Sequence, residues 1–470
     1  MSDLERNYSF LRAYVKGEAA IGFWNMIGKI VGAGNALILI SHLEVFQYGT
    51  YILIIAFYSL LSGFISPILQ GVILNDIGRF IGEGNEASAK RLYLETVCVR
   101  LCTALIIAIV VFWGADIVAQ YYDEDIGLLL RIIAPLFIID TIYNAMKLLF
   151  QVRLRFHTMS VRAVVYRIVR FVLLVAAVFF STLTVTEALV IHVIATLIAM
   201  LVLVLPFRNV YREWKKVIAT PQWLLPRIAM TYGKWQFFGQ VSSQLTSNIR
   251  PWLIKFFINT EAVAVYSVAE SLFGVVKSFI PTETLVSLLP REARNHERAG
   301  RLLLRGTKYL AIGSIAVALV AGVVVPPIAV LLFPKYAASM PLFQILLISL
   351  PILSFRAMAT NFLTLFREQK FLFVSLMIKV AANIILPVSL LYLFGISGMA
   401  IERSATALLL AFIMYGYLVR HNLDASLPWA RILFHFDNED KQFLQNLYRR
   451  SASYARRKIY NTMRLFSSQP

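Results

Sequence analysis

The stretch 236-QFFGQVSSQLTSNIRPWLIKFF-257 is long and apolar enough to cross a lipid bilayer, yet it contains Arg250 beside a proline, and Lys255. A charged side chain at the centre of a bilayer costs about 2.5–3.5 kcal/mol on insertion scales, so it is retained only with a partner or beside water. This stretch therefore predicts a membrane helix with one hydrophilic side.

Apolar segments of this length recur along nearly the whole chain. Hydrophobic residues make up 59% of the 470 residues, above the roughly 45–50% of soluble domains. About 20 apolar residues span the hydrocarbon core of a bilayer. We therefore expect an all-α integral membrane protein with twelve transmembrane helices, at 18–41, 46–74, 92–114, 126–150, 159–181, 186–206, 235–258, 263–288, 306–333, 340–366, 371–394 and 398–420.

The positive charges alternate from one side of the predicted membrane to the other. Short cytoplasmic loops collect Lys and Arg. With the N-terminus placed inside, the inner segments hold most of the 45 Lys and Arg residues, and the six outer connections hold one, Lys335. Both termini are therefore expected in the cytoplasm. The same distribution explains most of the net charge of +19, so we expect membrane lipids and not nucleic acid as partners.

Two phrases occur in similar form in each half of the chain. The first half has 43-LEVFQYGTYIL-53 followed by 79-RFIGEGNEASAKRL-92, and the second has 259-NTEAVAVYSVA-269 followed by 291-REARNHERAGRLL-303. Internal duplication explains both pairs. Because each copy would span six helices, the copies share one orientation, which predicts two six-helix lobes related by a pseudo-twofold axis along the membrane normal.

These observations predict four regions. They are an N-terminal lobe at 1–206, a cytoplasmic inter-lobe linker at 207–234, a C-terminal lobe at 235–420 and a tail at 421–470. The linker combines six positive charges with two prolines and several aromatic residues, as expected of a bridge along the cytoplasmic interface. The tail has an apolar stripe opposite a basic one, which predicts an amphipathic helix on the anionic inner leaflet; a solvated tail is the alternative.

Polar residues at helical spacing indicate which helix faces point inward, because lipid-facing positions favour Leu, Ile, Val and Phe. Such stripes occur in the spans 18–41, 46–74, 235–258 and 263–288. They predict a cationic substrate-binding cavity lined by Asn25, Lys29, Ser66, Gln70, Gln240, Ser243, Ser247, Arg250, Glu270 and Lys277.

The charged residues leave two interpretations open. Lys29, Arg250 and Lys277 are expected either to face the cavity or to form structural bridges, for example from Arg250 to Glu270. The neighbouring Glu402 and Arg403 lie near an outer helix end, where a simple interfacial ion pair is an equally good interpretation.

Transport against a gradient requires energy, and the chain contains no nucleotide-binding motif. A membrane potential supplies about 2.3 kcal/mol per charge per 100 mV. The acidic residues within the predicted spans that could couple transport to an ion gradient are Glu270, Glu18, Asp140 and Glu283. A permanently ionised partner of Arg250 or Lys277 is the alternative role for Glu270. No cofactor or metal site is expected.

Over residues of about 15–420, the repeated phrases and the two-lobe plan resemble the Wzx-like O-antigen and exopolysaccharide flippases of the multidrug, oligosaccharidyl-lipid and polysaccharide exporter superfamily. The resemblance implies a cavity lined by helices 1, 2, 7 and 8, the four with polar stripes. It also implies alternating-access transport of an undecaprenyl-diphosphate-linked oligosaccharide to the periplasmic leaflet of a bacterial inner membrane, driven by an ion gradient. A polysaccharide polymerase and a chain-length regulator would be its protein partners.

Two other functions compete with this interpretation. A lipid II or multidrug exporter would share the fold, although an exporter of organic cations should have a pocket dominated by carboxylates. A membrane-embedded polysaccharide polymerase or glycosyltransferase would need acids, bases or a metal gathered at one membrane face. The predicted outer connections are short and contain one acidic cluster, 123-DED-125, so we expect a transporter and not an enzyme.

Overall fold

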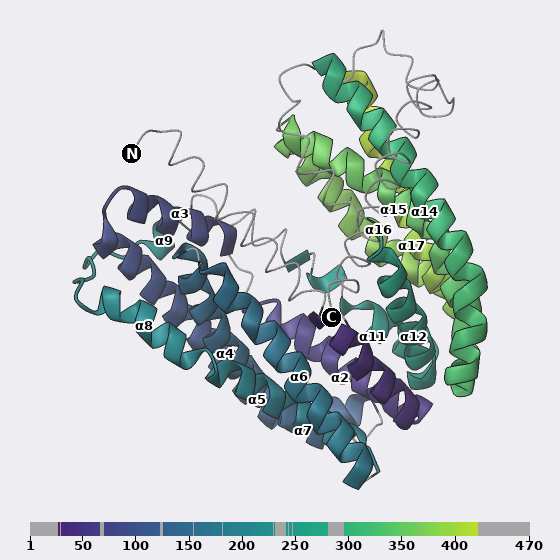
Figure 1. The fold of residues 1–470 in the computed structure, drawn as a ribbon, viewed down its shortest axis with the longest axis horizontal. Coiled ribbons are helices and arrows are strands. Elements are labelled where there is room, and N and C mark those ends of the chain that lie inside the picture. The colour runs from purple at the N-terminus through teal and green to yellow at the C-terminus, as the bar shows by residue number, and fades with distance from the viewer. Residues whose placement is uncertain are drawn as a thin grey trace, which may run out of the picture. The chain divides into compact units, whose positions relative to one another are not determined.

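The computed structural model is helical in the parts of the chain that it describes (Figure 1). These are residues 27–28, 30–65, 70–122, 126–153, 155–180, 182–228, 230, 241–242, 244–246, 248–280, 296–366 and 368–421. Apart from one short 3-10 helix, η2 (Pro334–Tyr336), the elements in this part are α-helices. The expected all-helical architecture is therefore confirmed.

The helices follow the predicted spans with shifted ends. The first half contains α2 (Val45–Ser62), α3 (Gln70–Gly82), α4 (Glu86–Tyr122), α5 (Gly127–Val152), α6 (Phe156–Phe180), α7 (Val185–Leu201), α8 (Val204–Lys215) and α9 (Leu225–Ile228). The second half contains α11 (Arg250–Phe257), α12 (Thr260–Lys277), α14 (His296–Leu332), α15 (Ser339–Leu365), α16 (Gln369–Phe394) and α17 (Ile396–His421).

Eight of the described helices are long and apolar enough to cross a membrane, or nine if α7 and α8, bent by 42°, form one span. The other three predicted spans, 18–41, 235–258 and 263–288, lie partly outside the described residues. The described part of the last one, α12, contains three charged residues, Glu261, Glu270 and Lys277, so its polarity and not its length separates it from the others.

One predicted span, 46–74, is not a single helix. Helix α2 ends at Ser62 and is followed by a turn at Gly63–Ile65, and α3 begins at Gln70. The polar stripe predicted along this span assumed an unbroken helix; Ser66 lies outside the described residues and the Gln70 side chain is not described, so the stripe itself stays a prediction. A Cβ atom at Gly63 would collide with the side chain of Gln244, so glycine leaves room for this side chain beside the end of α2.

Residue contacts divide the chain into two compact units. The first comprises Met1–Val275, Ala321–Leu347 and Leu376–Thr406, and the second comprises Val276–Val320, Ile348–Ser375 and Ala407–Pro470. In the first unit α4, α5, α6 and α7 pack alongside one another. Its main core is apolar and includes Ile54, Leu130, Phe137 and Leu189. The core of the second unit includes Met358, Phe362 and Leu418.

Within the first unit, α2 lies directly against the start of α12. A Cβ atom at Gly49 would collide with the carbonyl oxygen of Thr260. Small residues allow such close approach between membrane helices. Gly49 lies within the repeated phrase 47-QYGTYIL-53, so this part of the phrase has a packing function.

Candidate functional site

The candidate site includes Arg250, which lies beside a bend in the backbone. Ile249 is a bend, Arg250 is the first residue of α11 and Pro251 follows it. Proline is tolerated in the first turn of a helix, where its missing N–H would have no intrahelical partner. Of the polar stripe predicted from 236 to 250, Arg250 is the residue that the described part of the chain contains.

Arg250 is paired with a fully buried carboxylate on α17. Its Nε donates to Oε2 of Glu402 at 3.2 Å, and a terminal nitrogen donates to Oε1 at 3.4 Å. The same nitrogen donates to Oδ1 of Asn383 on α16 at 3.4 Å. Thr406 adds a hydrogen bond to Oε1 of Glu402 at 2.9 Å. The Glu402 side chain is 0% exposed. Each of its two carboxylate oxygens accepts a hydrogen bond from the protein, so neither needs a water molecule as a donor.

The next residue of α17, Arg403, pairs with a different helix. It donates to Oε1 of Glu270 on α12 at 2.5 Å, and its guanidinium lies 4.6 Å from the centre of the Phe273 ring. The Glu270 side chain is 40% exposed, unlike that of Glu402. In this second pair, Arg403 donates to one oxygen of a carboxylate that solvent can reach.

These contacts correct both structural alternatives drawn from the sequence. Arg250 bridges to Glu402 and not to Glu270, and Glu402 and Arg403 do not pair with each other. Neighbouring residues on a helix point about 100° apart because the helix has 3.6 residues per turn. Glu402 and Arg403 therefore reach two separate helices, α11 and α12, and all four residues lie in the first unit.

A second charged cluster lies in the first half of the chain, around Asp140 of α5. Tyr58 of α2 donates to Oδ2 of Asp140 at 2.5 Å, and Arg162 of α6 donates to Oδ1 at 2.7 Å. The Arg162 guanidinium lies 3.8 Å from the centre of the Tyr143 ring. The Asp140 side chain is 29% exposed, so this predicted coupling candidate is partly accessible.

Helix α6 continues this cluster with a second arginine. Arg170 donates to the hydroxyl of Tyr51 at 2.6 Å and to that of Tyr166 at 3.1 Å, and Tyr166 is 3.1 Å from Nδ1 of His192. Both arginines lie within the predicted span 159–181, but neither was proposed as a site residue. Their spacing with Tyr166 at steps of four residues was the signal that could have placed them on one helix face.

The structure places only part of the predicted cavity set. Arg250 and Glu270 lie close to α17, but in different ion pairs, and Lys277 is exposed at the end of α12. Gln70 begins α3, and its side chain is not described. The remaining predicted cavity and coupling residues fall outside the described residues, namely Asn25, Lys29, Ser66, Gln240, Ser243, Ser247, Glu18 and Glu283. Over the described ranges, no group of three or more His, Cys, Asp or Glu residues is arranged to hold a metal ion.

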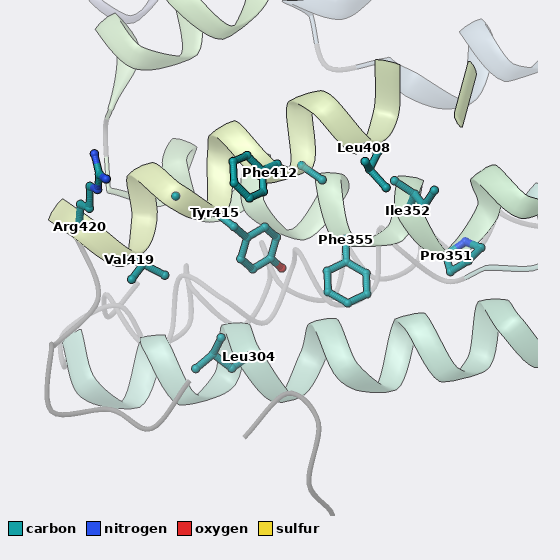
Figure 2. A pocket seen from close by; sticks show the side chains of 11 residues that line it. Leu304, Pro351, Ile352, Phe355, Leu408, Phe412, Tyr415, Val419 and Arg420 are labelled. Atoms are coloured by element: carbon teal, nitrogen blue, oxygen red, sulfur yellow. The ribbon is translucent and has the colours of Figure 1, made fainter. Parts of the chain in front are cut away.

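The second unit contains a separate apolar groove with a volume of about 660 Å³ (Figure 2). Leu304 of α14 and Pro351, Ile352 and Phe355 of α15 form one side of it. One face of α17 forms the other side, with Leu408, Ala411, Phe412, Tyr415, Gly416, Val419 and Arg420. No residue proposed from the sequence as a cavity residue lines this groove.

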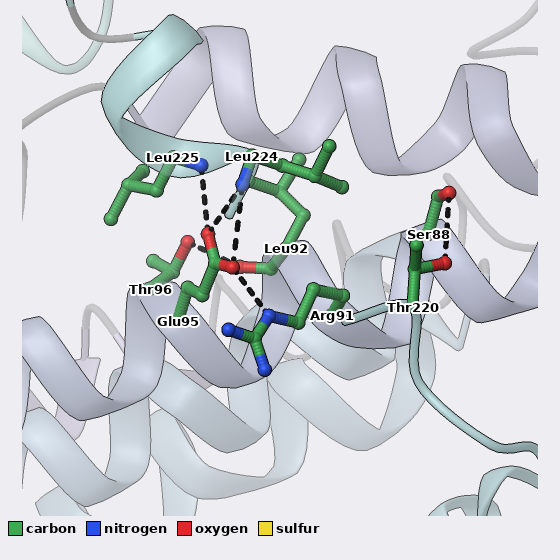
Figure 3. Close-up of polar contacts among 8 residues, drawn as sticks. All are labelled: Ser88, Arg91, Leu92, Glu95, Thr96, Thr220, Leu224 and Leu225. Atoms are coloured by element: carbon green, nitrogen blue, oxygen red, sulfur yellow. Dashed lines mark hydrogen bonds and ion pairs between the residues drawn. The ribbon is translucent and has the colours of Figure 1, made fainter. Parts of the chain in front are cut away.

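The segment after α7 is fastened to α4 by buried polar contacts (Figure 3). Glu95 of α4 accepts from the backbone N–H groups of Leu224 and Leu225 at the start of α9, at 3.0 and 2.7 Å, and from Arg91 at 2.5 Å. A carboxylate at a helix N-terminus satisfies donors that the helix leaves open. Lys90 binds the carbonyl oxygens of Trp214 and Val217 at the end of α8. The predicted linker is thus held, at least to Leu225, by the first half of the chain.

The comparison with solved structures identifies the fold. The fold matches the lipid II flippase MurJ in an inward closed conformation, with a TM-score of 0.70, 12% identity, and 94% of this chain and 99% of that chain covered. It also matches an inward-facing multidrug resistance MATE transporter of the MOP superfamily, with a TM-score of 0.67, 14% identity, and 83% and 93% coverage. The MATE transporter DinF-BH in complex with R6G gives a TM-score of 0.58 at 15% identity, with 90% and 97% coverage.

These similarities confirm the expected fold class, a membrane protein of twelve helices in two six-helix lobes. The chain is thus a multi-pass membrane protein. The family model described as "Polysaccharide biosynthesis protein" matches residues 43–312. The chain belongs to this family. No curated protein matches it in sequence.

Proposed function

We propose that this protein is a flippase that moves an undecaprenyl-diphosphate-linked oligosaccharide from the cytoplasmic to the periplasmic leaflet of a bacterial inner membrane. Membership of a polysaccharide biosynthesis family supports the sugar part of this substrate. The similarity to a lipid II flippase supports a lipid carrier. Both termini would be cytoplasmic, as the distribution of Lys and Arg predicts.

The contrast between the two ion pairs on α17 is the observation that carries the proposal. Glu402 is 0% exposed and occupied by Arg250 and Thr406. Arg403 is held by Glu270, whose side chain is 40% exposed. A guanidinium binds phosphate oxygens as readily as it binds a carboxylate, and can do so with two parallel hydrogen bonds. Arg403 is therefore the cation that can exchange a carboxylate for the diphosphate of a substrate, while Arg250 positions α17.

Ion coupling follows from the same exchange. A proton on Glu270 would remove the negative charge that holds Arg403, and Arg403 would then be available to the diphosphate. Loss of the proton would restore the ion pair and release the substrate. Asp140 is the second candidate for proton binding, because it is partly exposed and has Arg162 as an alternating partner.

Alternating access would come from rocking of an N-terminal lobe at 1–206 against a C-terminal lobe at 235–420. The contacts of Glu95 and Lys90 support a linker that stays with the N-terminal lobe. A polysaccharide polymerase and a chain-length regulator would act on the transported product.

Reconstituted vesicles test the proposal directly. Purified protein should transfer a fluorescent polyprenyl-diphosphate oligosaccharide between leaflets, and Arg403→Gln should slow transfer at least tenfold while the exposed-cation control Arg208→Gln does not. A pH-sensitive dye inside the vesicles should report proton movement that depends on substrate and is lost in Glu270→Gln. Equal transfer rates in the Arg403→Gln variant and the wild type would contradict the role of Arg403. Transfer of lipid II or efflux of an organic cation, without transfer of the oligosaccharide, would assign the other exporter functions.

A further inference from the structure

We infer that the groove between α14, α15 and α17 is a binding site for one anionic phospholipid, with an acyl chain along the groove and the lipid phosphate on Arg420. This site is separate from the ion pairs of α11, α12 and α17, and the inference does not depend on the proposed substrate. The groove lies wholly within the second unit.

The lining of the groove matches a hydrocarbon chain. Apart from the Arg420 guanidinium, the side chains that line it are apolar or aromatic. The one hydroxyl among them, that of Tyr415, is hydrogen-bonded to Thr307 at 2.5 Å, so the ring and not the hydroxyl remains for a ligand. The volume of about 660 Å³ lies within the ~300–1,000 Å³ typical of ligand pockets.

The groove is hollow because of one residue on α17. A Cβ atom added at Gly416 would meet no other atom within 4 Å. The two residues one turn away on the same face, Phe412 and Arg420, are both exposed. Gly416 lies between Phe412 and Arg420 in sequence, and Figure 2 shows Arg420 at one end of this face of α17 and Leu408 at the other. Glycine therefore leaves room for a chain where a larger residue would fill the groove.

The length of the groove selects the occupant. Leu408 and Arg420 are twelve residues apart, which corresponds to about 18 Å along a helix at ~1.5 Å per residue. One leaflet is about 15 Å deep, half of the ~30 Å hydrocarbon core. An acyl chain of one leaflet therefore fits between the apolar end and Arg420, whereas the much longer tail of a polyprenyl carrier would extend beyond it.

The charge at one end of the groove selects the headgroup. Within the described residues, no carboxylate pairs with the exposed Arg420 guanidinium. Basic side chains at the membrane surface attract anionic lipids, and a guanidinium suits phosphate geometry. A lipid with net negative charge, such as phosphatidylglycerol, is therefore preferred over a zwitterionic lipid with the same chains.

Native mass spectrometry of the purified full-length protein tests this site. Delipidated protein is titrated with phosphatidylglycerol, with phosphatidylcholine of the same chains, and with polyprenyl phosphate. The variants are Gly416→Leu, which fills the groove, and Arg420→Gln, which removes the charge. Leu409→Phe on the same helix and Arg208→Gln on α8 are the matched controls, because neither residue lines the groove.

We expect the wild type to retain one phosphatidylglycerol molecule. Gly416→Leu should bind it at least tenfold more weakly, and both control variants should bind it as the wild type does. Arg420→Gln should lose the preference for phosphatidylglycerol over phosphatidylcholine. A photoreactive acyl chain should label α15 and α17 in the wild type and not in Gly416→Leu, which keeps a binding loss distinct from misfolding. Unchanged binding by Gly416→Leu, displacement of phosphatidylglycerol by equimolar polyprenyl phosphate, or failure of the wild type to retain any lipid would each overturn the assignment.

Discussion

Two neighbouring residues of α17 take part in ion pairs of opposite character. Glu402 is fully buried and contacts Arg250 and Thr406, and Arg250 also contacts Asn383. One residue later, Arg403 contacts a glutamate whose side chain is 40% exposed. Taking a charge out of water costs several kcal/mol, which its partners must offset. The two ion pairs therefore differ in role. The buried Arg250–Glu402 pair joins helices, whereas the partly exposed Glu270–Arg403 pair can exchange one of its partners.

The strongest test of this comparison removes Arg250. Arg250→Ala leaves the Glu402 carboxylate buried without its cation, and breaking such a pair costs about 3–5 kcal/mol. We expect a large fall in melting temperature in detergent and a lower yield in the membrane.

The matched control is the double variant Arg250→Met with Glu402→Leu, in which no charge is left unpaired. It should recover most of the lost stability, because apolar replacement of a whole buried pair is often neutral. If Arg250→Ala alone were as stable as the wild type, the Arg250–Glu402 pair would not hold α11 to α17.

The Asp140 cluster should respond less to loss of Tyr58, because its cation Arg162 still pairs with the carboxylate. Tyr58→Phe removes the hydroxyl that binds Asp140 at 2.5 Å and leaves Arg162 in place. Hydrogen bonds to charged groups contribute about 1.5–3 kcal/mol, so a moderate loss of thermal stability is expected. Tyr392→Phe, at a tyrosine that is 83% exposed, is the control and should change nothing. A loss as large as that of Arg250→Ala would show that Tyr58 is the main partner of Asp140.

The open pair should show a small effect on stability and a large one on transport. Exposed ion pairs contribute about 0–1 kcal/mol and this one is partly exposed, so the exchanged pair Glu270→Arg with Arg403→Glu should lower the melting temperature less than Arg250→Ala does. Transport should stay at least tenfold reduced, because the arginine has moved from α17 to α12. Full recovery of lipid-linked oligosaccharide transfer in vesicles would mean that the pair acts only as a helix contact.

The fold could be predicted from the sequence because a bilayer admits few solutions. Every backbone polar group must be satisfied within lipid, so long apolar segments become helices. Their number and repeated order follow from the spacing of those segments, and the similar structures confirm both. The break after Ser62 was missed because Ser59, Gly63, Ser66 and Gln70 keep helical spacing across it.

The site was harder to predict because ion pairs join helices that are distant in sequence. Arg250 and Glu402 are separated by 152 positions, and no local spacing indicates that they meet. Arg162 and Arg170 were not proposed as site residues, since positive charge near a helix end is also what a cytoplasmic loop contains. Residues that share one helix, as in the polar stripes, are visible in sequence, whereas the pairing between stripes depends on packing.

A cation outside the membrane spans provides the mildest test of how these charges are held. Lys335, in η2, donates to the carbonyl oxygens of Ser41 and Leu43 at 2.8 and 2.6 Å. Burial lowers the pKa of Lys335 below its usual 10.5, and the nearby Glu44 opposes this shift. Between the lowered pKa and 10.5, the unfolded chain binds more protons than the folded one, so the free energy of unfolding rises with pH in this window. Melting curves at closely spaced pH values should show this rise in the wild type and not in Lys335→Met. The change in melting temperature should be smaller than that caused by the substitutions described above. A fall in wild-type stability relative to Lys335→Met across the same window would mean that the carbonyl contacts favour the charged amine more than burial disfavours it.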